Sequence, residues 1–105
     1  MALEQRWSHR KPISMDVTLY YPPMGTIPGK TRNISLEGMC VDTGGVTLPE
    51  HARVEIEFTT RAGTGMLSHR MPAYVVHNTP HGLGLMLQHV DYQDFHALRY
   101  MLNVA

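Results

Sequence analysis

The chain has 105 residues, of which 43% are hydrophobic and 17% are charged. This length suffices for one hydrophobic core, and the low charge argues against a disordered tail or a long polar coiled coil. Nine basic side chains balance nine acidic ones, so no global field attracts the protein to a nucleic acid polymer or an anionic membrane. Any anionic ligand therefore has to be held by a local cluster of cations.

The cysteine content and the N-terminus indicate the compartment. Cys40 is the single cysteine and cannot form an internal disulfide, which favours a reducing environment. Residues 1–6 contain no hydrophobic segment typical of a signal peptide, and no apolar run is long enough to span a membrane. We therefore expect a small soluble protein of the cytoplasm with no membrane insertion.

The first residues predict an arm rather than part of the core. Residues 1–12 are polar and hold Arg6, Arg10 and Lys11 ahead of Pro12, which stops any helix. We expect them to form an N-terminal arm and residues 13–105 to form a single domain.

Apolar and polar residues then alternate with a period of two from Ile13 to Tyr21, which predicts a half-buried strand. The segment 22–25 and the pair Pro28-Gly29 predict a loop. Further strands are expected, separated by turns that contain glycine or proline, over residues 30–34, 39–43, 54–59, 66–77 and 83–87.

Pro72 lies inside one of these strands and implies a sheet edge or a bulge there. After Val90 the period becomes helical: Asp91 can cap a helix, and Val90 and Phe95 have the spacing of a hydrophobic staple. The apolar stripe consists of Phe95, Leu98, Met101 and Leu102. Six short strands and one C-terminal helix favour a small barrel or sandwich, with the helix in one opening or on the sheet.

Histidine is frequent, with seven residues in the chain. Four of them lie in one segment: His69, His77, His81 and His89. His77 and His81 are four residues apart, but they fall in an expected strand and turn and not on a helix as in a zinc protease, and Cys40 is the only thiol. We interpret them as polar strand and turn residues and predict no metal site. A zinc- or iron-dependent enzyme remains an alternative.

Nucleophilic catalysis has no better support. Cys40 is interpreted as a small buried side chain, and no serine lies in a Gly-x-Ser-x-Gly elbow. We therefore predict no catalytic residue and no enzyme activity. Six methionines fall at apolar positions and are interpreted as core residues, with a methionine-lined partner surface as the alternative: Met15, Met39, Met66, Met71, Met86 and Met101.

Two local patterns are sharper. Arg6 and Arg10 are separated by three residues, and Asn33, Ser35 and Gly38 form an Asn-x-Ser-x-x-Gly motif. Taken alone, the first fits a solvated arm. The second fits a turn in which Asn33 and Ser35 satisfy the local backbone and Gly38 supplies a positive φ.

Together and in this order, the two patterns resemble the signature of the PilZ domain, a bacterial receptor module for cyclic di-GMP. That signature is Arg-x-x-x-Arg followed by Asp/Asn-x-Ser-x-x-Gly; here 22 residues lie between Arg10 and Asn33. The similarity continues through the segments 54–58, 73–76 and 82–87 to the closing helix. It implies a mainly all-β fold, namely a six-stranded antiparallel PilZ-type β-barrel with a C-terminal α-helix.

The resemblance also implies a ligand, cyclic di-GMP, and no other cofactor. The implied binding residues are Gln5, Arg6, Arg10, Asn33, Ser35 and Gly38. Asn33 replaces the more frequent aspartate. Gln5 stands where many relatives have another arginine, a change that bears on whether one or two ligand molecules stack in the site.

By this resemblance the protein is a receptor and adaptor that switches conformation on binding cyclic di-GMP. It would regulate motility, biofilm or exopolysaccharide output through an unidentified effector protein. One alternative is a PilZ-like protein–protein adaptor that does not bind nucleotide, as in pilus biogenesis. Another, a small-barrel binder of nucleic acids, is disfavoured by the neutral charge. The outer face of the helix is interpreted first as a solvated face, with a homodimer or a partner contact as the alternative; its residues are Tyr92, Gln93, His96, Arg99 and Tyr100.

Overall fold

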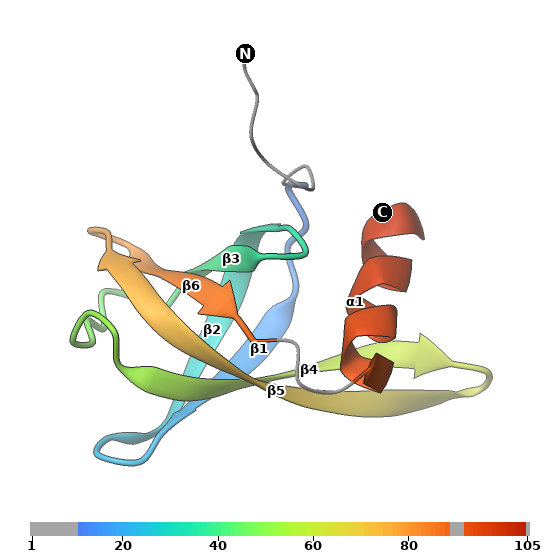
Figure 1. Ribbon diagram of the computed structural model, residues 1–105, viewed down its shortest axis with the longest axis horizontal. Coiled ribbons are helices and arrows are strands. Elements are labelled where there is room, and N and C mark those ends of the chain that lie inside the picture. The colour runs from blue at the N-terminus through green and yellow to red at the C-terminus, as the bar shows by residue number, and fades with distance from the viewer. Residues whose placement is uncertain (1–10, 89–91, 105) are drawn as a thin grey trace.

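The computed structural model describes residues 11–88 and 92–104. These residues form six strands and one helix: β1 (Asp16–Tyr21), β2 (Gly25–Ile34), β3 (Gly38–Asp42), β4 (Arg53–Ala62), β5 (Gly65–Asn78), β6 (Gly82–Leu87) and α1 (Tyr92–Val104). The strands close into an antiparallel barrel in the order β1-β2-β3-β6-β5-β4 (Figure 1). The expected six-stranded barrel with a C-terminal helix is confirmed.

The alternation of residue types explains how the strands bury a core. In β4, Val54, Ile56 and Phe58 are buried inside the barrel, whereas Glu55 and Glu57 lie on its outer face. The same alternation buries Val17 and Leu19 in β1 and three leucines in β6. Because successive side chains of a strand point to opposite faces, one sequence pattern fixes both the core and the solvent face.

The pair Pro28-Gly29 was expected in a loop, and this expectation is wrong. The chain turns at residues 22–24, and β2 begins at Gly25, whose φ of 87° suits a glycine. Pro28 then pairs with Thr18 of β1, while pairing with β3 begins only at Lys30. At Pro28 the strand has a neighbour on one side only, which is where a strand tolerates a residue without an N–H group.

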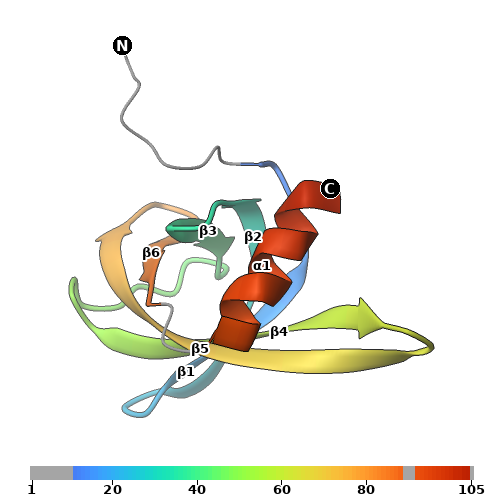
Figure 2. The same cartoon turned by 45° about the vertical axis from the view of Figure 1, so that its right-hand side comes forward.

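Pro72 occupies a similar position in β5, as expected. It pairs with Glu55 of β4, and pairing with β6 starts one residue later, at Ala73. The first half of β5 and the second half of β4 therefore extend beyond the barrel as a two-stranded hairpin, close to α1 (Figures 1 and 2).

Helix α1 packs against β5. Leu98 and Leu102 are buried and belong to the barrel core, which confirms that part of the predicted stripe. The predicted cap Asp91, the Val90–Phe95 staple and the side chain of Met101 lie outside the part of the chain that the structure describes. No described helix is long and apolar enough to cross a bilayer.

The methionines divide between the core and the surface. Met39 and Met71 are buried and Met15 packs against the core, as expected. Met66 and Met86, however, are 62% and 42% exposed, so their assignment to the core is wrong. Met86 alternates with the buried leucines of β6, and Met66 lies on the hairpin that extends past the barrel.

Gly38 has a different structural role from the one expected. Its φ is not among the positive values of the described residues, so it supplies no left-handed turn. Instead, a Cβ atom at this position would overlap the carbonyl oxygen of Leu85 on β6. Gly38 therefore allows strands β3 and β6 to approach each other.

We predict that Gly38→Ala destabilises the protein by about 1–3 kcal/mol, because the added methyl group meets backbone that cannot move aside. Urea unfolding would measure the loss. The control is Gly63→Asn at the tip of the β4–β5 hairpin, where φ is 61° and the space is open. Asparagine tolerates this conformation, so equal stability losses in the two variants would contradict the role assigned to Gly38.

Candidate functional site

The first described residue is anchored at the end of β2. The Lys11 N–H donates to the Ile34 carbonyl at 2.8 Å, and the Ile34 N–H donates to the Lys11 carbonyl at 2.9 Å. Ile34 lies between Asn33 and Ser35 of the second motif. The backbone that follows the arginine motif is thereby fixed beside the second motif, and pairing begins two residues before the predicted domain boundary.

Thr31 strengthens this attachment. Its side chain is buried, and its hydroxyl donates to the Ile13 carbonyl at 2.6 Å and accepts from the Met15 N–H at 2.9 Å. Its backbone N–H also donates to the Met15 carbonyl. No motif in the sequence marked Thr31 or Lys11 as part of the site, because their contribution depends on which strand the arm meets.

Ser35 forms the turn between β2 and β3. Its hydroxyl accepts from the Glu37 and Gly38 N–H groups, and its proton lies within reach of the Gly38 carbonyl and the Glu37 carboxylate, each at 3.2 Å. Ser35 is 1% exposed. A hydroxyl has two acceptor positions and one proton, so this turn uses its full capacity. Its role is to shape the turn, as the local reading of the motif predicts.

Asn33 is half-buried on the outer face of the barrel. It pairs with Cys40 of β3, which alternates with the buried Met39 and Val41. Directly opposed residues share a face, so Asn33 and Cys40 both point outward. Cys40 is half-buried rather than buried as expected, because its neighbours occupy the inward positions.

The structure brings together one half of the expected site. Asn33, Ser35 and Gly38 meet at the β2–β3 turn. Gln5, Arg6 and Arg10 lie outside the described residues, so their assignment stays a prediction.

We predict that Ser35→Ala lowers the free energy of unfolding by about 1–3 kcal/mol, because it leaves two N–H groups of the turn without their acceptor. Chemical denaturation would test this value. Ser14→Ala, at an exposed position, serves as the control and should leave stability within about 0.5 kcal/mol. A neutral Ser35→Ala variant would show that the turn does not depend on the hydroxyl.

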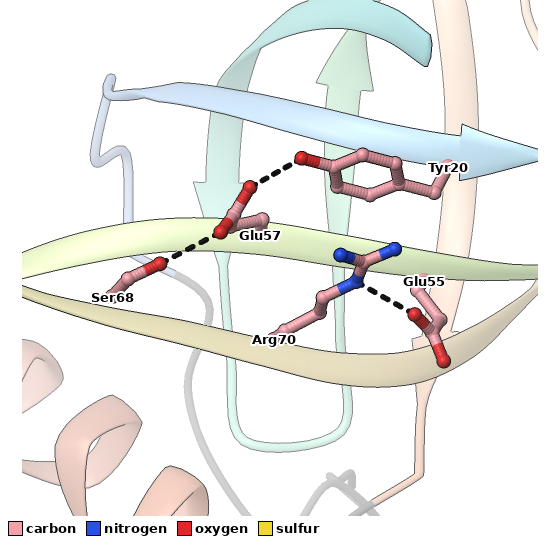
Figure 3. Close-up of polar contacts among 5 residues, drawn as sticks. All are labelled: Tyr20, Glu55, Glu57, Ser68 and Arg70. Atoms are coloured by element: carbon pink, nitrogen blue, oxygen red, sulfur yellow. Dashed lines mark hydrogen bonds and ion pairs between the residues drawn. The ribbon is translucent and has the colours of Figure 1, made fainter. Parts of the chain in front are cut away.

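A second polar cluster lies across the barrel, on the outer face of β1, β4 and β5 (Figure 3). The Tyr20 hydroxyl donates to Glu57 at 2.5 Å, and Ser68 donates to the other oxygen of Glu57 at 2.8 Å. Arg70 donates to Glu55 at 2.7 Å and stacks over the Tyr20 ring, 3.7 Å from its centroid. Shallow hollows of about 300 and 340 Å³ flank the cluster. Because these polar groups pair with one another, we assign them to joining the three strands.

The hydrogen bond between Tyr20 and Glu57 shifts both pKa values in opposite directions. It raises the pKa of Tyr20, with smaller contributions from partial burial and the Glu57 charge. It lowers the pKa of Glu57, and the hydrogen bond from Ser68 adds to this effect. A carboxyl whose pKa is lowered by folding stabilises the protein above its unfolded pKa. That contribution disappears as the pH falls through the folded value.

We predict that Tyr20→Phe raises the pKa of Glu57 towards the ordinary carboxyl value, because the largest stabilising contact of the carboxylate is removed. Carbon-detected NMR titration of the Glu57 carboxyl would measure this shift. Ser68→Ala should raise the same pKa by less. An unchanged Glu57 pKa in Tyr20→Phe would refute this explanation of the shift.

One of the described histidines has a clear structural role. His69 is buried, its ring stacks on Phe58 with centroids 5.2 Å apart, and its Nε2 lies 2.8 Å from the Thr60 hydroxyl. Within residues 11–88 and 92–104, no three His, Cys, Asp or Glu side chains gather as metal ligands do.

A small closed antiparallel barrel, with Lys11 paired beside a serine-glycine turn and with a C-terminal helix, defines the class of protein. The family description "PilZ domain" matches residues 4–103. The chain therefore belongs to the PilZ family, which comprises receptors for cyclic di-GMP. None of the curated proteins compared with the chain matches it.

Two solved structures are similar to the fold. The PilZ domain of CeSA from a cellulose-synthesizing bacterium has a TM-score of 0.71 at 18% identity, over 92% of this chain and 97% of that one. The Bacillus subtilis inhibitor of motility MotI/DgrA has a TM-score of 0.78 at 17% identity, over 96% of this chain and 51% of that one. At these identities the similarity concerns the fold alone.

Proposed function

We propose that this chain binds cyclic di-GMP between its N-terminal arginine motif and the outer side of the β2–β3 turn. The proposal rests on family membership and on one contact, the pairing of Lys11 with Ile34. Arg10 directly precedes Lys11 in the sequence, and Ile34 directly follows Asn33. A ligand held by both motifs therefore needs no rearrangement of the barrel.

The chemistry of the ligand matches these residue types. Cyclic di-GMP carries two phosphates and two guanines, whose O6 and N7 atoms are acceptors. The planar guanidinium groups of Arg6 and Arg10 can each donate two parallel hydrogen bonds to a phosphate or a guanine edge, or stack on a purine. A lysine would supply the charge without this fork.

Asn33 is the residue of the second motif that we expect to contact the nucleotide. Its amide can accept from the guanine N–H groups and donate to an acceptor. Ser35 and Gly38 act through the turn, since the Ser35 hydroxyl is fully used there and Gly38 lies against β6. Gln5 would influence how many ligand molecules stack.

The proposed mechanism is a switch rather than catalysis. Binding would fix Arg6 and Arg10 against the barrel and create a surface that an effector protein recognises. Motility, biofilm and exopolysaccharide production are the processes we propose for this output. We propose the exposed face of α1 as the surface that the effector or a second copy of the chain contacts; it includes Gln93, His96, Arg99 and Tyr100.

We predict that Arg6→Ala and Arg10→Ala each weaken cyclic di-GMP binding by at least about 10-fold, because a charge-assisted hydrogen bond is worth about 1.5–3 kcal/mol. Isothermal titration calorimetry would give the affinity and the stoichiometry. Arg61→Ala is the matched control, since Arg61 is an exposed arginine on the β4–β5 hairpin.

Unchanged affinity in both motif variants would refute the assigned roles. A wild-type protein that does not bind the nucleotide would favour the alternative of an adaptor that works through protein contacts alone.

A further inference from the structure

Four strands present one cross-strand row of residues on the outer face. Asn33 of β2 pairs with Cys40 of β3, Cys40 pairs with Gly84 of β6, and Gly84 pairs with His77 of β5. Adjacent strands lie about 4.8 Å apart, so the row follows the curved surface for about 14 Å. One end of the row is the asparagine of the second motif, and the other end is a histidine.

Both end residues reach the outer face through a β-bulge. Thr31 and Val75 point into the barrel, and in a regular strand the residues two positions later, Asn33 and His77, would also point inward. The register shifts by one residue after Thr31 in β2 and again after Val75 in β5. Each extra residue turns the next side chain outward, and bulges are frequent where a functional side chain is re-aimed.

The imidazole of His77 covers the bare backbone of Gly84. A Cβ atom on Gly84 would lie 2.6 and 2.8 Å from Nε2 and Nδ1, and closer still to Cε1. Because these three atoms would be almost equally near, the face of the ring rather than its edge lies over Gly84. His77 is exposed, so the opposite face of the ring is open to solvent. Because the ring lies over Gly84, it is about two strand spacings from Asn33, one fewer than the backbone of His77.

We propose that His77 is the base-stacking residue of the nucleotide site, holding one guanine on its open face while Asn33 contacts the ligand from the other end of the row. This inference rests on the proposed function. Bases stack on histidine as on other aromatic side chains. Gly84 has no side chain and Cys40 has a small one, so a planar base can lie along the barrel surface between the two end residues.

The experiment is calorimetric titration of cyclic di-GMP into wild-type protein and into His77→Ala, His77→Leu and His77→Trp. Loss of a base-stacking side chain costs on the order of 5- to 100-fold in affinity. We expect His77→Ala and His77→Leu to bind at least about fivefold more weakly and His77→Trp to retain or exceed wild-type affinity. His81→Ala, an exposed histidine in the β5–β6 turn, is the matched control.

The variants separate stacking from a purely structural role. Leucine covers Gly84 without a planar ring, so His77→Leu tests the proposal even if the alanine variant does not fold. Wild-type affinity in His77→Trp requires an aromatic face at this position. If wild type binds and His77→Leu binds equally well, the stacking role is refuted while the proposed function stands. If wild type shows no binding, both are refuted.

Discussion

The proposed site depends on the two hydrogen bonds between Lys11 and Ile34. They fix the chain immediately after the arginine motif to the strand that carries Asn33 and Ser35. Thr31 anchors the residues after Lys11 through a buried hydroxyl, which donates to the Ile13 carbonyl and accepts from the Met15 N–H. The residue that follows the arginine motif and the residues of the second motif, distant along the chain, therefore lie side by side on the closed barrel, where we propose that a ligand is held.

A closed barrel imposes strict alternation, and the outer row of side chains depends on two exceptions to it. Without the bulges in β2 and β5, Asn33 and His77 would be placed in the core, where an amide and an imidazole need partners. With the bulges, both side chains face outward in one cross-strand row, with Cys40 and Gly84 between them. The cluster of Tyr20, Glu57 and Arg70 lies instead over β1, β4 and β5, away from that row, and is occupied by its own hydrogen bonds.

Alternation and turn residues in the sequence predicted the six strands, the closing helix and most of the core, but left a barrel and a sandwich both open, and the resemblance to the PilZ domain selected the barrel. The same alternation predicts that Met86 and Cys40 face outward. Both were assigned to the core because their side chains are apolar. The position of Pro28 within a strand was not predicted, because a strand tolerates proline there only where pairing with β3 has not yet begun. The bulges were not predicted, because a one-residue shift in register has no sequence signature here. In the second motif, the role of Ser35 in the turn was predicted from the motif itself, whereas the role of Gly38 depends on its approach to Leu85 of β6, a contact that no residue spacing reveals.

The most direct measurement of the central claim is an amide ¹H–¹⁵N chemical-shift map recorded during titration with cyclic di-GMP. The account predicts that the largest shift changes fall on Lys11, Ile34, Ser35 and their neighbours, continue across the outer row to His77, and leave the Tyr20–Arg70 face unchanged. Shift changes centred on that opposite face, with the β2–β3 turn unaffected, would contradict it.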